Sequence, residues 1–179
     1  MGVTSENCEE ALLPHLDAAY NLARWLTRDA RDAEDVVQEA YLRALKHFGT
    51  FKGGDARPWL LKIVRNTFYT WIKHNRVSDA MTPFDEQEDI HVSDAASPEM
   101  LLVKEADQRL VRRALKELPT EFLEVILLRE FEELSYQQIA DTVQIPVGTV
   151  MSRLARARGR LAQIITSCHE GLAAVELAL

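Results

Sequence analysis

The chain has 179 residues, of which 47% are apolar, with 28 acidic against 21 basic side chains and a formal net charge of −7. This length allows one large domain or two small ones with a buried core. The few Gly and Pro residues, 7 and 6, argue against a strand-rich or disordered chain. The net charge alone argues against binding nucleic acid. Because an average can hide separate acidic and basic segments, the distribution of charge along the chain is the better guide to whether nucleic acid binds.

The two cysteines, Cys8 and Cys168, lie at opposite ends of the sequence, which has neither a signal peptide nor a long apolar span. This pattern predicts a reduced, cytoplasmic protein with no membrane insertion. Cys168 and His169 are adjacent and could bind a metal, but no second ligand pair follows at zinc spacing. We therefore predict no metal and no cofactor.

Three segments before residue 77 have apolar residues at helical spacing. The segments carry Leu12, Leu16, Tyr20, Ala23 and Leu26; then Val36, Val37, Ala40, Tyr41, Ala44 and Leu45; then Leu60, Ile63, Val64, Thr67, Phe68 and Trp71. Each is expected to be one helix, the third running from about Arg57 to Arg76. The loop before it contains Gly53 and Gly54, which supply backbone freedom, and Pro58, which suits a first helical turn.

The composition changes sharply from Val77 to Glu99, "VSDAMTPFDEQEDIHVSDAASPE". This stretch holds seven carboxylates, two prolines and no Lys or Arg. It has too little apolar surface to offset the entropy lost on ordering. We predict a flexible acidic linker, and the two parts that flank it are together close to neutral.

Helical spacing returns after the linker, and no segment shows the alternation of a strand, so we predict an all-α chain of two small domains. Pro119 opens one helix, and Ser135 with Gln138 has the spacing of a capping box for the next. A turn over roughly 144–146 then separates two helices in the layout of a helix-turn-helix. The inward residues expected are Ile139, Ala140, Val143, Val150 and Leu154.

The last of these helices contains "MSRLARARGR", with arginines and no carboxylate. Arg153, Arg156 and Arg160 are spaced by three and four and share one face, whereas Arg158 points elsewhere. Such a face fits the phosphates and base edges of a DNA major groove. The alternative is a solvated basic face, which usually interleaves acids. The residues expected nearest the bases are Val147, Gly148, Thr149, Met151 and Ser152.

The stretch "LPTEFLEVILLREFEELSYQQIADTVQIPVGTVMSRLARARGRL" resembles the promoter −35-binding domain of extracytoplasmic-function (ECF) sigma factors of the sigma-70 family. "DAEDVVQEAYLRAL" and "RPWLLKIVRNTFYTWIKHNR" resemble the other conserved domain of that family. Three residues depart from the family pattern: Gln144 stands where Gly is usual, Leu123 where Arg is frequent and Thr70 where an acid is common. A left-handed Gln144 would carry strain of about 1 kcal/mol.

The resemblance implies a sigma2-like helical bundle over 8–77, the acidic linker over 78–98, a sigma4-like helix-turn-helix domain over 99–172 and a tail over 173–179. It implies an alternative sigma factor that binds core RNA polymerase, at the clamp helices of its largest subunit and at its flap. Promoter DNA and an anti-sigma factor are further implied partners. The linker would thread through positive polymerase cavities, so neutralising Asp85, Glu86, Glu88 and Asp89 is expected to weaken assembly or alter promoter escape.

The outer side of the third helix mixes cations, aromatic rings and an amide, which suits single-stranded DNA because bases stack on rings while cations hold phosphates. Its members are Trp59, Lys62, Arg65, Asn66, Tyr69, Lys73 and Arg76. For Trp59, packing in the core is an equal alternative, and Trp71 is expected to be a core residue. "FKGGDAR" resembles the family loop that captures a −10 base, with Lys52, Asp55 and Arg57 as its polar contacts.

The resemblance assigns core-polymerase contact to the outer side of the second helix, which carries Asp32, Asp35, Gln38, Glu39 and Arg43. From the residues alone, a solvated helix whose acids oppose the helix dipole explains this pattern better.

No catalytic constellation is visible, so no enzyme is expected. Two non-enzymatic alternatives are weighed against a sigma factor. A stand-alone helix-turn-helix regulator would leave the cations and aromatic rings of the third helix without a function. An adaptor that only sequesters an anti-sigma factor would need no base-reading residues.

Overall fold

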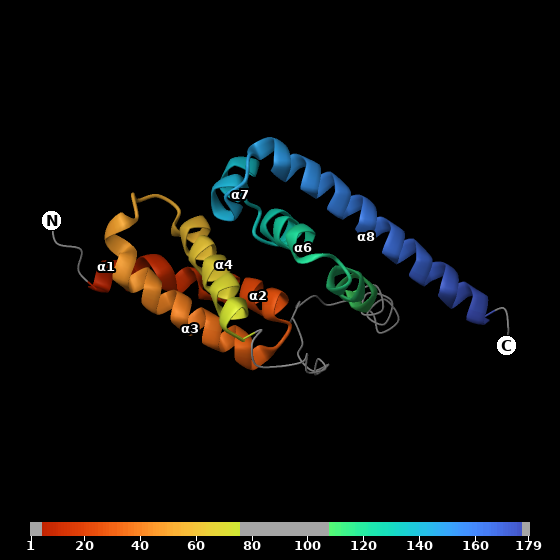
Figure 1. Ribbon diagram of the computed structural model, residues 1–179, viewed down its shortest axis with the longest axis horizontal. Coiled ribbons are helices and arrows are strands. Elements are labelled where there is room, and N and C mark those ends of the chain that lie inside the picture. Colours follow the sequence, from red (N-terminus) through yellow and green to blue (C-terminus); the bar gives the residue numbers. More distant parts are fainter. Residues whose placement is uncertain (1–4, 76–107, 177–179) are drawn as a thin grey trace, which may run out of the picture.

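The computed structural model describes residues 5–75 and 108–176, with side chains described for 7–75 and 108–168. The predicted linker, 78–98, and Arg76 lie outside the described residues. Within the described ranges the regular elements are helices and no strand occurs, as the sequence predicted. Figure 1 shows the helices in two groups, with the first four, in red to yellow, beside those that come after residue 108.

The first group is a helical bundle. In chain order its elements are α1 (Ser5–Leu12), the 3₁₀ turn η1 (Leu13–His15), α2 (Leu16–Thr27), α3 (Ala30–His47), the 3₁₀ turn η2 (Phe48–Thr50) and α4 (Ala56–Asn75). Helices α2, α3 and α4 pack against one another pairwise. Alanines at buried positions of α2 and α3, such as Ala23 and Ala40 at 0% exposure, let these helices approach closely.

The single helix expected over Leu12–Leu26 is wrong, because the chain is broken at Leu13–His15. Pro14 has no amide hydrogen, and its ring clashes with the carbonyl of the residue four places earlier, so it ends α1 and allows only a 3₁₀ turn before α2. Helix α2 then ends at Arg28, which is left-handed (φ 63°). The Asp29 carboxylate accepts hydrogen bonds from the amides of Arg31 (2.9 Å) and Asp32 (3.1 Å) and caps α3.

The second group contains a helix over 108–116, then α6 (Thr120–Ile126), the π-helical turn η3 (Leu127–Phe131), α7 (Tyr136–Val143) and α8 (Val147–Glu176). In η3 the amide of Glu132 donates to the carbonyl of Leu127 at 3.1 Å, the five-residue step of a π turn. This wider turn places both Leu127 and Leu128 in the core.

Helices α7 and α8 form the predicted helix-turn-helix. The Ser135 side chain accepts from the amide of Gln138, whose own side chain accepts from the Ser135 amide, so the capping box is confirmed. Gln144 has φ 61°, the left-handed conformation that its place in the turn demands. The five residues expected to face inward, Ile139, Ala140, Val143, Val150 and Leu154, are all buried.

The two groups share one continuous core. Helix α4 packs against α7, and α2 against α6, so α4 is covered by helices from both groups. In Figure 1 α7 lies beside the start of α4. Leu61 of α4, which the predicted apolar stripe did not include, is as fully buried as Leu60 on the stripe.

Candidate nucleic-acid interface

The predicted arginine row of α8 divides in two. Arg153 turns toward its own domain, where its Nη2 lies 3.5 Å from Glu121 Oε2 and its side chain is only 24% exposed. Arg156 and Arg160 are exposed and pair with no carboxylate within the described ranges. These two guanidiniums therefore offer positive charge to a partner without first giving up an internal one.

Arg158 points away from that row, as predicted, and meets the carboxylate of Glu130. Its Nη2 and Nε donate to Glu130 Oε1 at 2.6 and 3.2 Å, and this hydrogen bonding raises the pKa of Arg158. Together with Glu121, Glu130 supplies the acids that are missing from the stretch "MSRLARARGR" of α8. Arg153 and Arg158 are thus salt-bridged to acids of their own domain, whereas for the exposed Arg156 and Arg160 both interpretations, a DNA-binding face and a solvated basic face, stay open.

The start of α8 presents a mixed surface. Gly148, Met151 and Ser152 are exposed, Thr149 is half-buried, and Val147 packs partly against the core. The first turn of the helix contains no acidic residue. The positive end of the helix dipole therefore favours an anion such as a phosphate.

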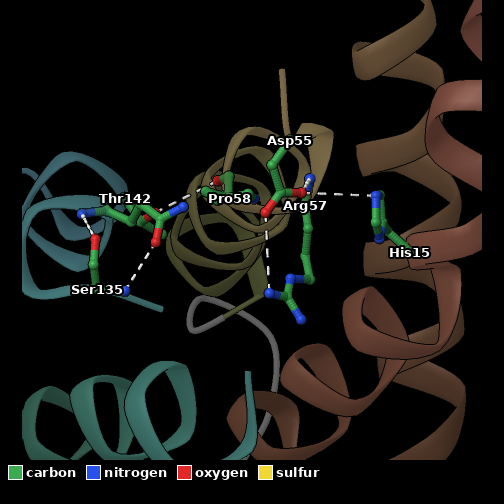
Figure 2. Close-up of polar contacts among 7 residues, drawn as sticks. His15, Asp55, Arg57, Pro58, Ser135 and Thr142 are labelled. Atoms are coloured by element: carbon green, nitrogen blue, oxygen red, sulfur yellow. Dashed lines mark hydrogen bonds and ion pairs between the residues drawn. The ribbon is translucent and has the colours of Figure 1, made fainter. Parts of the chain in front are cut away.

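The 51–57 loop is shaped by two glycines and one carboxylate. Gly53 and Gly54 have φ of 85° and 88°, so both need the freedom that the sequence predicted. Asp55 Oδ1 accepts from the amide of Arg57 at 2.9 Å and lies 3.8 Å from His15 Nε2 (Figure 2). Asp55 thereby joins the start of α4 to η1, while Lys52 remains exposed.

Trp59 belongs to an aromatic cluster behind this loop. Its ring meets Phe48 edge-on at 6.0 Å between centroids and lies 5.5 Å from Phe51. It is half-buried, so packing occupies part of the ring and leaves part accessible. Trp71, predicted to be a core residue, is also half-buried and packs against the core.

The outer side of α4 is covered along part of its length. Asn66 and Lys73 are exposed and Lys62 is half-buried. Arg65, in contrast, has a side chain only 15% exposed, and its Nε lies 3.2 Å from Glu124 Oε2 on α6. Tyr69 donates its hydroxyl hydrogen to Glu124 Oε1.

Glu124 is itself 1% exposed. Although Arg65 Nε and Glu124 Oε2 are close enough for an ion pair, neither atom completes a hydrogen bond with any described residue. The Arg65 guanidinium also stacks over the Tyr69 ring, 4.6 Å from its centroid. Burial, followed by the hydrogen bond to Glu124, raises the pKa of Tyr69, so the phenol stays protonated and remains a donor.

A second buried acid, Glu132, follows directly after η3. It is 8% exposed, and its burial raises its pKa while the charge of Arg57 lowers it. Both acids were missed in the sequence. The available signal was Glu124 itself, a single carboxylate inside the apolar run "FLEVILL", where an ionised side chain needs a buried partner.

The residues assigned to polymerase contact lie along α3. Asp35, Gln38 and Glu39 are exposed, and Arg43 Nε donates to Glu39 Oε1 at 2.7 Å, one turn away. Asp32 is half-buried, and burial followed by the charges of Asp29 and Asp35 raises its pKa. Leu42, which sequence reasoning passed over, is 55% exposed among these polar side chains.

Within the described ranges, no group of three or more His, Cys, Asp and Glu side chains is placed to hold a metal ion. None of the helices there is both long and apolar enough to cross a membrane.

The geometry is that of a helical protein with a helix-turn-helix and exposed arginines, and comparison with known proteins identifies its family. Sigma-70 region 2 matches residues 12–77, and sigma-70 region 4 matches residues 108–161. The RNA polymerase sigma-H factor of Pseudomonas aeruginosa is 36% identical over 137 residues, which cover 73% of this chain and 71% of that protein. The ECF RNA polymerase sigma-E factor of Escherichia coli K12 is 34% identical over 134 residues, covering 71% and 70%.

A solved structure agrees with these relatives. The sigma factor RpoE of Bartonella quintana, in a co-crystal with the anti-sigma factor NepR, matches with a TM-score of 0.71 and 30% identity, covering 90% of this chain and 98% of that one. The chain belongs to the ECF group of the sigma-70 family of RNA polymerase sigma factors. It is thus an alternative sigma factor for transcription initiation, as the resemblance of its motifs implied.

Proposed function

We propose that the chain recruits core RNA polymerase to promoters through three surfaces on separate helices. The start of α8, with Arg156 and Arg160, binds the −35 element. The 51–57 loop and the outer side of α4 hold the −10 element and its unpaired strand. The outer side of α3, from Asp32 to Arg43, contacts the polymerase clamp helices.

The observation that carries the −35 assignment is the pair of exposed arginines, Arg156 and Arg160, on the second helix of a capped helix-turn-helix. A guanidinium without an internal carboxylate partner keeps its full charge for phosphate, and binding then releases condensed counterions from the DNA. Backbone contacts of this kind position the helix, while the exposed residues before Arg153 meet base edges.

The boundaries 8–77, 78–98, 99–172 and 173–179 remain our proposal for the two domains, the linker and the tail. We further propose that an anti-sigma factor regulates the chain. The complex of the Bartonella quintana sigma factor with NepR supports this, since that sigma factor is 30% identical to the chain. The protein would act in the cytoplasm as a subunit, without catalytic residues of its own.

The test is in vitro transcription with purified core polymerase on a promoter library. We expect run-off transcripts only when the chain is added, and their start sites define the −10 and −35 bases. Replacing both Arg156 and Arg160 by Ala should abolish most of the product from −35-dependent promoters. Tight, specific duplex binding without polymerase, together with an absence of transcripts, would instead identify a stand-alone regulator.

A further inference from the structure

Two ion pairs join the start of α8 to other elements of its own domain. Arg153 Nη2 lies 3.5 Å from Oε2 of Glu121, which belongs to α6. Arg158 donates from Nη2 and Nε to Oε1 of Glu130, in η3, at 2.6 and 3.2 Å. Two acids from two different elements therefore hold the same helix.

The spacing of the two arginines places these pairs around the helix. An α-helix turns about 100° per residue, so Arg153 and Arg158 lie about 140° apart around the axis of α8. The buried Val150, Leu154 and Ala157 all fall within this arc. The two ion pairs thus flank the buried stripe of α8, one on each side.

This placement controls the direction of the exposed side of α8. Apolar contacts are non-directional, so a buried stripe alone allows small rotations of the helix about its axis. Because the pairs lie on opposite flanks, rotation in either direction draws one of the two paired arginines away from the body of the domain. Arg156 and Arg160 are exposed and fall outside the arc, so the two pairs fix where these guanidiniums point.

Neither pair needs to stabilise the fold for this purpose. Glu130 and Arg158 are 47% and 49% exposed, and ion pairs in contact with water contribute little to the free energy of unfolding. Base-edge contacts, in contrast, depend on the direction of each side chain, and phosphate contacts fix how the helix lies on the duplex. A small rotation of α8 would therefore cost DNA specificity more than it costs stability.

We propose that Glu121 and Glu130 are positioning residues for −35 recognition: by holding Arg153 and Arg158, they fix the rotation of α8 about its axis and thereby the face that it presents to DNA. This inference rests on the proposed −35 function of α8. The two acids act through the arginines that they hold.

The first experiment measures the rotation of α8 in the full chain without DNA. Residual dipolar couplings of backbone amides vary periodically along a helix, and the phase of this variation reports rotation about the helix axis. In the double variant Glu121→Ala and Glu130→Ala, the variation along α8 should shift in phase or lose amplitude. A phase and an amplitude equal to those of the unmodified chain would overturn the proposal.

The matched control is Glu117→Ala. Glu117 is an exposed acid of the same half of the chain, and its carboxylate lies 3.7 Å from Arg113, one turn before it. The substitution removes the same charge and one exposed ion pair without touching α8. It should leave the couplings of α8 unchanged, and an equal change in this control would also contradict the proposal.

The second experiment measures the consequence for promoter choice, using the chain with core polymerase. Two templates share one −10 element, and one of them has a scrambled −35 element. The ratio of run-off product from the intact template to that from the scrambled template should fall about 2- to 5-fold in Glu130→Ala. It should stay near the unmodified value in Glu130→Gln, whose amide oxygen still accepts from Arg158.

The product ratio separates positioning from a purely structural role, which would lower product from both templates equally. A ratio in Glu130→Ala equal to that in Glu117→Ala would contradict positioning. If the unmodified holoenzyme does not distinguish the two templates, the proposed −35 function of α8 fails, whereas the dipolar couplings decide by themselves whether the two acids hold the helix.

Discussion

Helices α4 and α8 both carry cations at helical spacing, and both were assigned to DNA, but their surroundings differ. Arg65 on α4 is 15% exposed and meets an acid from the other half of the chain, whereas Arg156 and Arg160 on α8 are exposed and unpaired within the described ranges. Helical spacing fixes which side chains share a face, while tertiary contacts decide whether that face is available. Under the proposed function, Arg156 and Arg160 of α8 would meet duplex DNA as they stand, whereas Arg65 of α4 would first have to leave Glu124.

The largest expected effect is on stability, and it tests whether the position of α8 depends on the packing of its buried side. Leu154 is 1% exposed and anchors α8 to its domain. Leu154→Ala should lower the free energy of unfolding by about 2 to 5 kcal/mol through lost burial and the cavity left behind. Urea unfolding followed by circular dichroism measures it. Met151→Ala, on the exposed side of the same helix, should change stability by less than about 0.5 kcal/mol.

A second prediction compares two arginines that lie two residues apart. Arg156→Ala should weaken −35 binding severalfold and make the slope of log affinity against log salt shallower by about 1, because one phosphate contact is lost. Arg158→Ala removes the same charge, but from a side chain held 2.6 Å from Glu130. It should leave the salt slope nearly unchanged. Fluorescence anisotropy over a salt series measures both, and equal slopes for the two variants would remove Arg156 from the interface.

The third prediction concerns the turn that presents α8. Gln144 has φ 61°, a conformation that glycine adopts without the steric cost of a Cβ. Gln144→Gly should therefore stabilise the chain by up to about 1 kcal/mol. Gln137→Gly, inside α7, should instead destabilise it by about 1 kcal/mol. Thermal unfolding of the two variants gives opposite shifts in Tm if the turn is strained, and a lowered Tm for both would show that it is not.

The smallest effect concerns Glu132, the buried acid directly after η3. Burial raises the pKa of Glu132 above its ordinary value of 4.5. The folded chain thus holds this proton more tightly than the unfolded chain, so the stabilisation is complete below the unfolded pKa and is lost as the pH rises through the folded pKa. Glu132→Gln, which stays neutral, should have a higher Tm than the unmodified chain at pH 7. The difference in Tm between the two chains should shrink on acidification toward pH 4. A difference in Tm that does not change with pH would contradict the raised pKa of Glu132.

Much of the second half could be predicted from sequence because its determinants are local. The capping box joins Ser135 to Gln138, and the turn residue Gln144 follows α7 directly, so short-range patterns were sufficient. The break before α2 was missed although Pro14 was visible, because the apolar spacing from Leu12 to Leu26 continues across it.

The covering of α4 could not be predicted in the same way. Tyr69 and Glu124 are 55 residues apart, and no spacing rule connects two helices separated by a linker. Tyr69 alone was interpreted as a stacking surface, and the place of Glu124 within "FLEVILL" indicates only that this acid needs a buried partner, not which one. Only the packing of α6 and α7 against α2 and α4 brings them together.

The π turn η3 has a consequence for how this molecule can change. A π turn holds one residue more than an α turn, and η3 joins α6, which carries Glu124, to the segment leading into α7 and α8. Deleting one residue between Leu127 and Phe131 would reduce η3 to an ordinary helical turn and remove the extra step that places both Leu127 and Leu128 in the core. A one-residue deletion in η3 would therefore change how α6 packs against α7 and α8, while Glu124 and the arginines of α8 stay in the sequence.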